Sequence, residues 1–173
     1  MDGFNLRHLV LAVALSSGMG SAFAATDNDF VDNAAAGGIA EIETSRLALE
    51  KSQSADIKAF ANMMITDHGK ANDELATIAK ANDIEVPDTT TLVKQAKEKI
   101  LEVRDESFDA AYANNQVKAH EETIELFKKQ ANTVTDDKVK GAPELKAFAQ
   151  KMLPALEKHL AAAKELQAKH PSK

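Results

Sequence analysis

Apolar residues recur at three- and four-residue spacing through most of this chain, which is the period of amphipathic α-helices. The pattern predicts a first helix capped by Asp27 or Asp29 and running to Lys51, followed by helices over 55–82, 91–103, 105–132 and 143–169. No segment alternates with the period of a strand. An all-α fold is therefore predicted, an antiparallel four-helix bundle with an extra short helix between the second and third long helices.

The apolar stripe of each of three long helices contains one histidine. The stripes consist of Ile57, Phe60, Met64, His68, Leu75 and Ile78 in one helix, Ala113, Val117, His120, Ile124 and Phe127 in the next, and Leu145, Phe148, Met152, Leu156, His159, Ala163 and Leu166 in the last. Charged residues mostly occupy the remaining positions. Each histidine is therefore expected to face the interior of the bundle and not the solvent.

The first 24 residues have the pattern of a cleavable signal peptide. Arg7 and His8 precede an apolar run from Leu9 to Leu15, and Ala22-Phe23-Ala24 has the small-x-small form of a cleavage site. The apolar run is too short to span a bilayer. The sequence therefore predicts a signal peptide over 1–24, one helical-bundle domain over 25–173, and no stable membrane insertion after cleavage. The signal peptide predicts export, to the periplasm or to the extracellular medium, and these residues do not separate the two.

Composition narrows the functions further. There is no Cys, which excludes disulfides, thiol catalysis and covalent c-type haem. The net charge of −6 argues against nucleic acid as a partner. No protein partner and no oligomeric state is indicated by these features.

One carboxylate joins the three histidines as a candidate metal ligand. On a helical projection Glu41 falls on the inward arc of the first helix, whereas Glu43 lies about 200° away and is expected to face water. A buried lone carboxylate needs a proton, a partner or a metal. Glu41, His68, His120 and His159 are thus the predicted metal ligands, and their types suit one divalent ion of Zn, Cu, Mn or Fe.

Neighbouring residues refine this hypothesis. Met64 and Met152 share the histidine stripes, where a thioether would favour copper, although methionine also serves as core filler. Asp67, Gln116 and Asn72 are candidates for orienting the imidazole rings. The alternative is that each histidine simply packs in the core with one hydrogen bond. A shared ion requires the ligand atoms to converge about 3–4 Å apart at one depth in the bundle.

Several motifs resemble a known family. They are Phe30-Val31, Ala35-Ala36-Gly37-Gly38-Ile39-Ala40-Glu41-Ile42, Leu47-Ala48, Lys58-Ala59-Phe60-Ala61, Met64-Ile65-Thr66-Asp67-His68, Asn72-Asp73-Glu74-Leu75, Ser107-Phe108-Asp109 with Tyr112 and His120, and Leu153-Pro154 with His159-Leu160. Together they resemble DUF4142, an exported ferritin-like family catalogued as a domain of unknown function and often labelled putative outer membrane protein. The resemblance implies a ferritin-like fold and export in a bacterium, with the periplasm as the expected location, and it supplies no activity.

The sequence departs from the di-iron members of the ferritin-like fold. Those proteins carry a Glu-x-x-His motif on two helices. Here the residues three positions before His68, His120 and His159 are Ile65, Val117 and Leu156. Oxygen chemistry at a di-iron pair is therefore not expected.

Three functions remain open from the sequence. The favoured one is a non-enzymatic envelope protein of accessory or stress-related character that holds one metal ion. The second is a mononuclear metal-dependent oxidoreductase or hydrolase, which needs an open coordination position and a pocket. The third is a protein-interaction module whose histidines only pack.

Overall fold

The computed structural model of the protein describes residues 28–100, 108–134 and 139–172. These ranges contain five helices, α1 (Asp29–Lys51), α2 (Ala55–Ala81), α3 (Thr89–Ile100), α4 (Phe108–Ala131) and α5 (Ala142–Lys169), and they contain no strand. The predicted all-α class is confirmed. The predicted signal peptide, residues 1–24, and the predicted start of the third long helix at Asp105 lie outside the described residues.

The helix ends follow local chemistry. Asn28 caps α1, with its side-chain oxygen accepting a hydrogen bond from the Val31 backbone N–H at 3.1 Å, so the prediction of a cap at Asp27 or Asp29 was wrong by one residue. Pro143 lies in the first turn of α5, as predicted, where its missing N–H costs no helical hydrogen bond. The α5 helix continues through Pro154 to Lys169.

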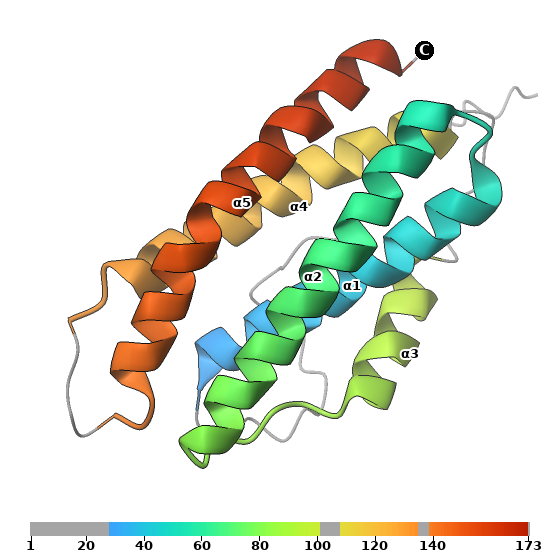
Figure 1. Cartoon of the computed structure of the whole chain (residues 1–173). Coiled ribbons are helices and arrows are strands. Elements are labelled where there is room, and N and C mark those ends of the chain that lie inside the picture. Colours follow the sequence, from blue (N-terminus) through green and yellow to red (C-terminus); the bar gives the residue numbers. More distant parts are fainter. Residues whose placement is uncertain (1–27, 101–107, 135–138, 173) are drawn as a thin grey trace, which may run out of the picture.

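The four long helices contact one another in a ring. α1 lies against α2 and α4, and α5 also lies against α2 and α4. α1 and α2 run in opposite directions, as do α4 and α5, whereas α2 and α4 run in the same direction (Figure 1). The chain between α2 and α4 therefore has to return along the length of the helices. It includes α3, which packs against α1.

Two hydrophobic clusters fill the space between the long helices. The first centres on Phe30, Phe127 and Phe148, whose ring centroids lie 5.1–6.4 Å apart. The second contains Phe60 and Tyr112, with ring centroids 6.2 Å apart, together with apolar residues of α1, α2, α4 and α5. Each cluster takes residues from all four long helices, so the interior is built in layers.

A polar layer lies between the two clusters. On α2 the buried members of the second cluster end at Met64 and those of the first begin at Leu75, and His68 falls between them. The same order holds for His120 on α4, His159 on α5 and Glu41 on α1. All four of these side chains are buried. Their shared place between the clusters puts four polar groups at a similar level of the interior.

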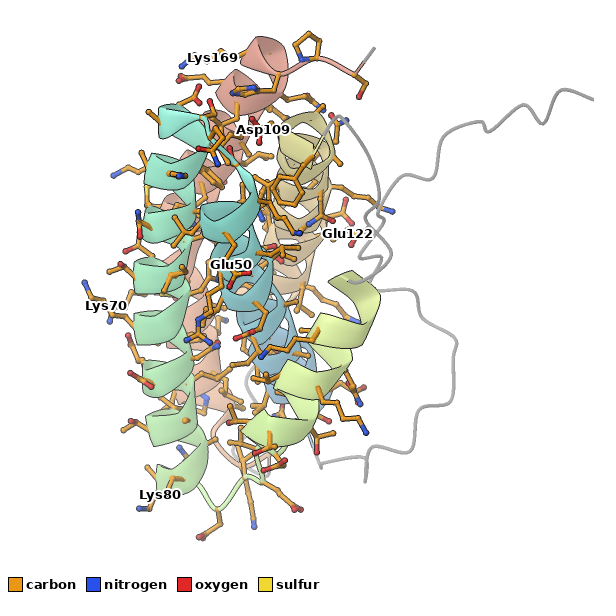
Figure 2. All side chains as sticks on the ribbon, turned by 90° about the vertical axis from the view of Figure 1, so that its right-hand side faces the viewer. Glu50, Lys70, Lys80, Asp109, Glu122 and Lys169 are labelled. Atoms are coloured by element: carbon orange, nitrogen blue, oxygen red, sulfur yellow. The ribbon has the colours of Figure 1, made fainter. Side chains whose placement is uncertain are left out.

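The exterior carries most of the charge. Lys70 and Lys80 of α2 and Lys169 of α5 are exposed and project away from the body of the protein (Figure 2). In the part of the chain that the structure describes, no helix has the length and apolar character needed to cross a membrane.

Glu43 is an exception to the predicted pattern. It is only 5% exposed, although its angular position on α1 predicted that it would face water. Lys97 of α3 lies 3.6 Å from one Glu43 carboxylate oxygen, and Arg46 pairs with the other. The prediction was wrong because α3 packs on this face of α1. The projection of a single helix carries no information on which neighbour will cover it.

Gly38 allows α1 and α2 to approach closely. A Cβ atom at Gly38 would lie 2.2 Å from the side-chain oxygen of Asn72 on α2, whereas one at Gly37 would meet no described atom within 4 Å. Gly38→Ala is therefore expected to destabilise the protein by about 1–3 kcal/mol through overpacking. Gly37→Ala is the matched control, and its effect is expected to be neutral or stabilising because alanine favours the helix. Urea unfolding of both variants measures the difference, and equal effects would contradict the close approach.

Candidate metal centre

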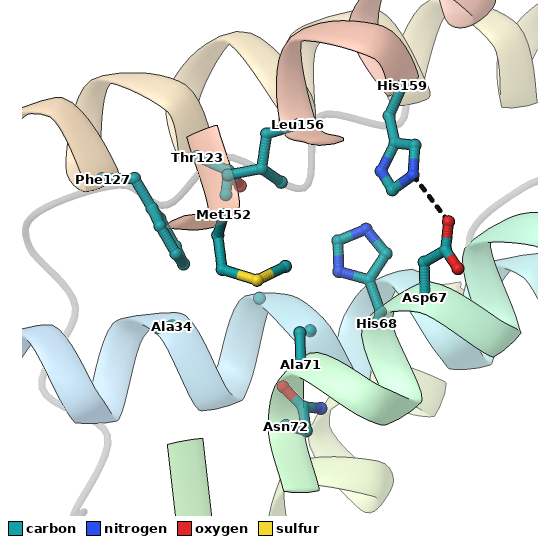
Figure 3. A pocket seen from close by; sticks show the side chains of 12 residues that line it. Ala34, Asp67, His68, Ala71, Asn72, Thr123, Phe127, Met152, Leu156 and His159 are labelled. Carbon is teal, nitrogen blue, oxygen red and sulfur yellow. Dashed lines mark hydrogen bonds and ion pairs between the residues drawn. The ribbon is translucent and has the colours of Figure 1, made fainter. Parts of the chain in front are cut away.

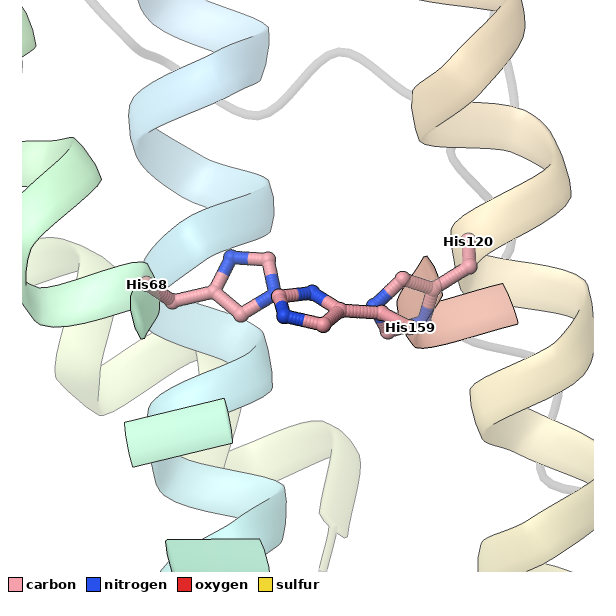
Figure 4. A group of neighbouring side chains, drawn as sticks. All are labelled: His68, His120 and His159. Carbon is pink, nitrogen blue, oxygen red and sulfur yellow. The ribbon is translucent and has the colours of Figure 1, made fainter. Parts of the chain in front are cut away.

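Three buried imidazoles meet in the polar layer. His68 from α2, His120 from α4 and His159 from α5 are 7%, 1% and 4% exposed. Their ring centroids form an almost equilateral triangle with sides of 5.5–5.6 Å. Figure 4 shows the three side chains lying next to one another between the helices. One ligand atom from each residue lies within 4.8 Å of the others. The convergence of three predicted ligands at one place is thus a feature of this fold.

The triangle is close to the size that a metal ion requires. With metal–nitrogen bonds of about 2.0–2.1 Å and tetrahedral angles, the ligand nitrogens lie about 3.3 Å apart. In the structure the ligand nitrogens are at most 4.8 Å apart, so each imidazole has to move toward the centre of the triangle by about 1 Å or less. Small rotations of the side chains provide such a movement without a change in the helices.

Hydrogen bonds orient two of the three rings. The His120 Nδ1–H donates to the backbone carbonyl of Gln116, one turn earlier on α4, at 2.8 Å. The His159 Nε2–H donates to the Asp67 carboxylate on α2 at 3.1 Å (Figure 3). Because both partners only accept, each bond fixes the tautomer and leaves the lone pair on the opposite nitrogen of the ring.

One nitrogen of each of the three rings is buried and lacks a hydrogen-bond partner in the described part of the chain. These atoms are His68 Nε2, His120 Nε2 and His159 Nδ1. A buried polar atom without a partner costs about 1–3 kcal/mol. Three such atoms in one cluster are therefore costly for a purely structural interior, and a bound metal ion would satisfy all three at once.

Burial also keeps the imidazoles of His68 and His159 neutral. It lowers the pKa of His68 to about 3, with smaller contributions from the positive charges that His120 and His159 would carry. Burial likewise lowers the pKa of His159, although the hydrogen bond to Asp67 opposes this effect. Only the neutral form of imidazole offers a lone pair to a metal. At neutral pH both rings are therefore ready to bind an ion without first losing a proton.

Glu41 lies in the same layer but outside the imidazole triangle. The group whose ligand atoms lie within 4.8 Å of one another consists of the three histidines. Glu41 is 6% exposed, and burial raises the pKa of its carboxyl, while the positive charge that a protonated His120 would carry and the Gln116 amide would lower it. Its Oε2 is buried without a hydrogen-bond partner in the described part of the chain. The arrangement favours a carboxyl that holds a proton next to the imidazoles.

The other predicted neighbours have different places. Asp67 orients His159, as predicted, and Gln116 orients His120 through its backbone carbonyl instead of its side chain. Met64 is fully buried in the second hydrophobic cluster with Phe60. Met152 lines a small cavity beside His68 and His159. The hydrogen bond to the Gln116 carbonyl could not be predicted from the residue type, because any residue one turn before His120 offers a backbone carbonyl.

Replacement of Asp67 by alanine is expected to weaken metal binding by about 10–100-fold, because the Nε2–H of His159 would lose the acceptor that fixes its tautomer and orientation. The side chain of Asp67 is 41% exposed, so its removal leaves no buried charge unpaired. Asp73→Ala, an exposed acid on the same helix, is the control. A competition titration against a coloured chelator measures both affinities. Equal affinities for the two variants would show that Asp67 does not position His159.

Comparison with known proteins supplies a family. The family model described as a domain of unknown function, DUF4142, matches residues 12–166, from within the predicted signal peptide almost to the end of α5. No curated protein and no solved structure matches the chain. The match confirms the resemblance drawn from the sequence motifs.

Proposed function

This chain belongs to the DUF4142 family, and we propose that it binds one divalent transition-metal ion through the imidazoles of His68, His120 and His159. Three partnerless imidazole nitrogens in one buried cluster support this assignment. Each comes from a different helix, so a bound ion would tie α2, α4 and α5 together at the middle of the molecule. Metal binding would then add to the stability of the fold.

The ligand set suits several ions. Neutral imidazole is a good ligand for Zn, Cu and Fe and also binds Mn. Three histidines are the protein ligands of one class of zinc site, in which the fourth position is left to water or another small molecule. Met152, near His68 and His159, offers a thioether that would favour copper if it reached the ion. Metal analysis decides among these ions.

The membership of Glu41 in the ligand set stays a prediction. Its carboxyl has to turn toward the imidazoles to reach a shared ion, because it is outside the 4.8 Å group. Glu41→Gln keeps the shape of the side chain and removes the acid. If this variant lost as much affinity as a variant without one imidazole, Glu41 would belong among the ligands. Unchanged affinity would leave it as a neighbouring acid.

The wider role follows from the predicted signal peptide and the fold. We infer an exported accessory protein of the cell envelope, with residues 1–24 removed after Ala24. The arrangement of α1 with α2 and of α4 with α5, joined by one long return connection, supports a ferritin-like four-helix bundle. Mass spectrometry of the intact protein from the periplasmic fraction tests the export, since a chain that retains residues 1–24 would contradict it.

Metal analysis tests the proposed function directly. The protein is purified without a histidine tag, and its metal content is measured together with its melting temperature before and after a chelator. We expect about one ion per chain, and a melting temperature that falls with the chelator and recovers with the added ion. If no ion is retained and Zn, Cu, Mn and Fe all leave the melting temperature unchanged, the three histidines only pack. The protein-interaction module would then be the better hypothesis.

A further inference from the structure

A small cavity adjoins the imidazole triangle. Its volume is about 30 Å³, and His68 and His159 both line it (Figure 3). A buried water needs about 10–15 Å³ of such space, so the cavity has room for about two water-sized groups. It is therefore too small for an organic substrate, and two of the three imidazoles that would hold the ion line it.

The walls of the cavity combine apolar surface with a few polar groups. Apolar side chains from α1, α2, α4 and α5 form most of it, among them Ala34, Ala71, Phe127, Met152 and Leu156. The polar lining comes from Asn72 and Thr123, together with Asp67, which is already bonded to His159. The Asn72 amide nitrogen is buried and lacks a hydrogen-bond partner in the described ranges. It is a donor without an acceptor, in the wall of a cavity beside a metal centre.

These features complement one another chemically. Three imidazoles leave at least one coordination position of a tetrahedral ion free. Glu41 does not line the cavity. A molecule that bound the ion at one end and accepted a hydrogen bond from Asn72 at the other would satisfy both the ion and the amide. The available volume limits such a molecule to two or three non-hydrogen atoms.

We propose that the cavity is the binding place for a small exogenous ligand, an oxygen or nitrogen donor of two or three non-hydrogen atoms that coordinates the ion held by His68, His120 and His159. The inference rests on the proposed metal site and adds its ligand class. Selection is by size and by hydrogen-bond acceptance. The apolar walls exclude larger polar molecules, and the Asn72 amide favours a ligand with a free lone pair.

Azide bound to the cobalt(II)-loaded protein is a direct probe, because cobalt(II) reports changes of its ligands in its visible absorption. We expect azide, with three atoms in a line, to give a saturable spectral change. Free imidazole, which is larger than the cavity, is expected to give none.

Two variants locate the bound azide. Ala71→Leu fills the cavity and is expected to abolish the azide response with cobalt still bound, whereas Ala59→Leu, an exposed alanine on the same helix, leaves it unchanged. Asn72→Ala adds no volume and removes the donor, so it is expected to weaken azide binding by about 10-fold. Because Asn72→Ala adds no bulk, it tests the site even if Ala71→Leu does not fold.

The outcomes separate the two proposals. Cobalt bound without any azide response would overturn the cavity ligand and leave the metal site in place. An azide response as strong in Ala71→Leu as in the natural chain would place the ligand outside the cavity, and would also overturn the inference. Failure to bind cobalt or any other tested ion would overturn the metal site and the ligand together.

Discussion

Replacement of His120 by alanine is expected to lower the affinity for the metal ion by more than about 100-fold. Changes to groups that only orient a ligand already cost about 10–100-fold, and His120 is itself one of three proposed ligands. It is 1% exposed, and its ring centroid lies 5.5–5.6 Å from the centroids of the other two imidazoles. Its Nδ1–H donates a hydrogen bond to the Gln116 carbonyl. Nothing else in the described polar layer offers a third imidazole in its place.

A control variant separates the loss of a metal ligand from a loss of folding. His170→Ala removes an imidazole that is bonded to Asp56 near the end of α5, away from the triangle, and is expected to bind the ion as the natural chain does. Isothermal titration with zinc measures both variants, with circular dichroism as a check on folding. His120→Phe keeps the volume in case the alanine variant is unstable. If both His120 variants retain the affinity of the natural chain, the triangle is not the site.

Acidification is expected to destabilise the metal-free protein by a few kcal/mol, the second large effect. The pKa of His68 is about 3 in the folded protein, against an ordinary value of 6.5. Between these two values the unfolded chain binds more protons than the folded one. The stability that depends on a neutral His68 is therefore fully present above about pH 6.5 and is lost as the pH falls toward 3. A loss on the order of a few kcal/mol is a large part of the free energy of unfolding, which is usually about 5–15 kcal/mol.

Two variants isolate the responsible groups. His68→Leu removes the buried imidazole, so the fall in stability on the acid side is expected to be smaller. Glu41 has the opposite effect on the pH dependence of stability, because burial raises its pKa from 4.5. The stability that its carboxyl contributes is fully present below about pH 4.5 and is lost as the pH rises through the pKa of the folded protein. Glu41→Gln is therefore expected to raise stability at neutral pH. Urea unfolding with chelator across the pH range measures all three proteins, and identical profiles would contradict both assignments.

Much of the local structure could be predicted because it depends on neighbours along the chain. The three- and four-residue spacing of apolar side chains predicted four long helices and a short one, and the observed bounds agree within a few residues where both ends are described. The inward direction of His68, His120 and His159 followed from the same spacing. The burial of Glu43 could not be predicted, because it depends on α3, a separate element, packing on that side of α1.

The sequence by itself determined that Glu41, His68, His120 and His159 would each point inward from one of the four long helices, since side-chain direction on a helix is set by residue spacing. Only the tertiary structure decided that one ligand atom from each imidazole lies within 4.8 Å of the others and that a cavity of about 30 Å³ adjoins them. It also decided that Asp67 accepts the hydrogen bond that fixes the tautomer of His159. Those features depend on how far each helix slides along its neighbours. That offset is decided by the packing of the two hydrophobic clusters above and below the polar layer.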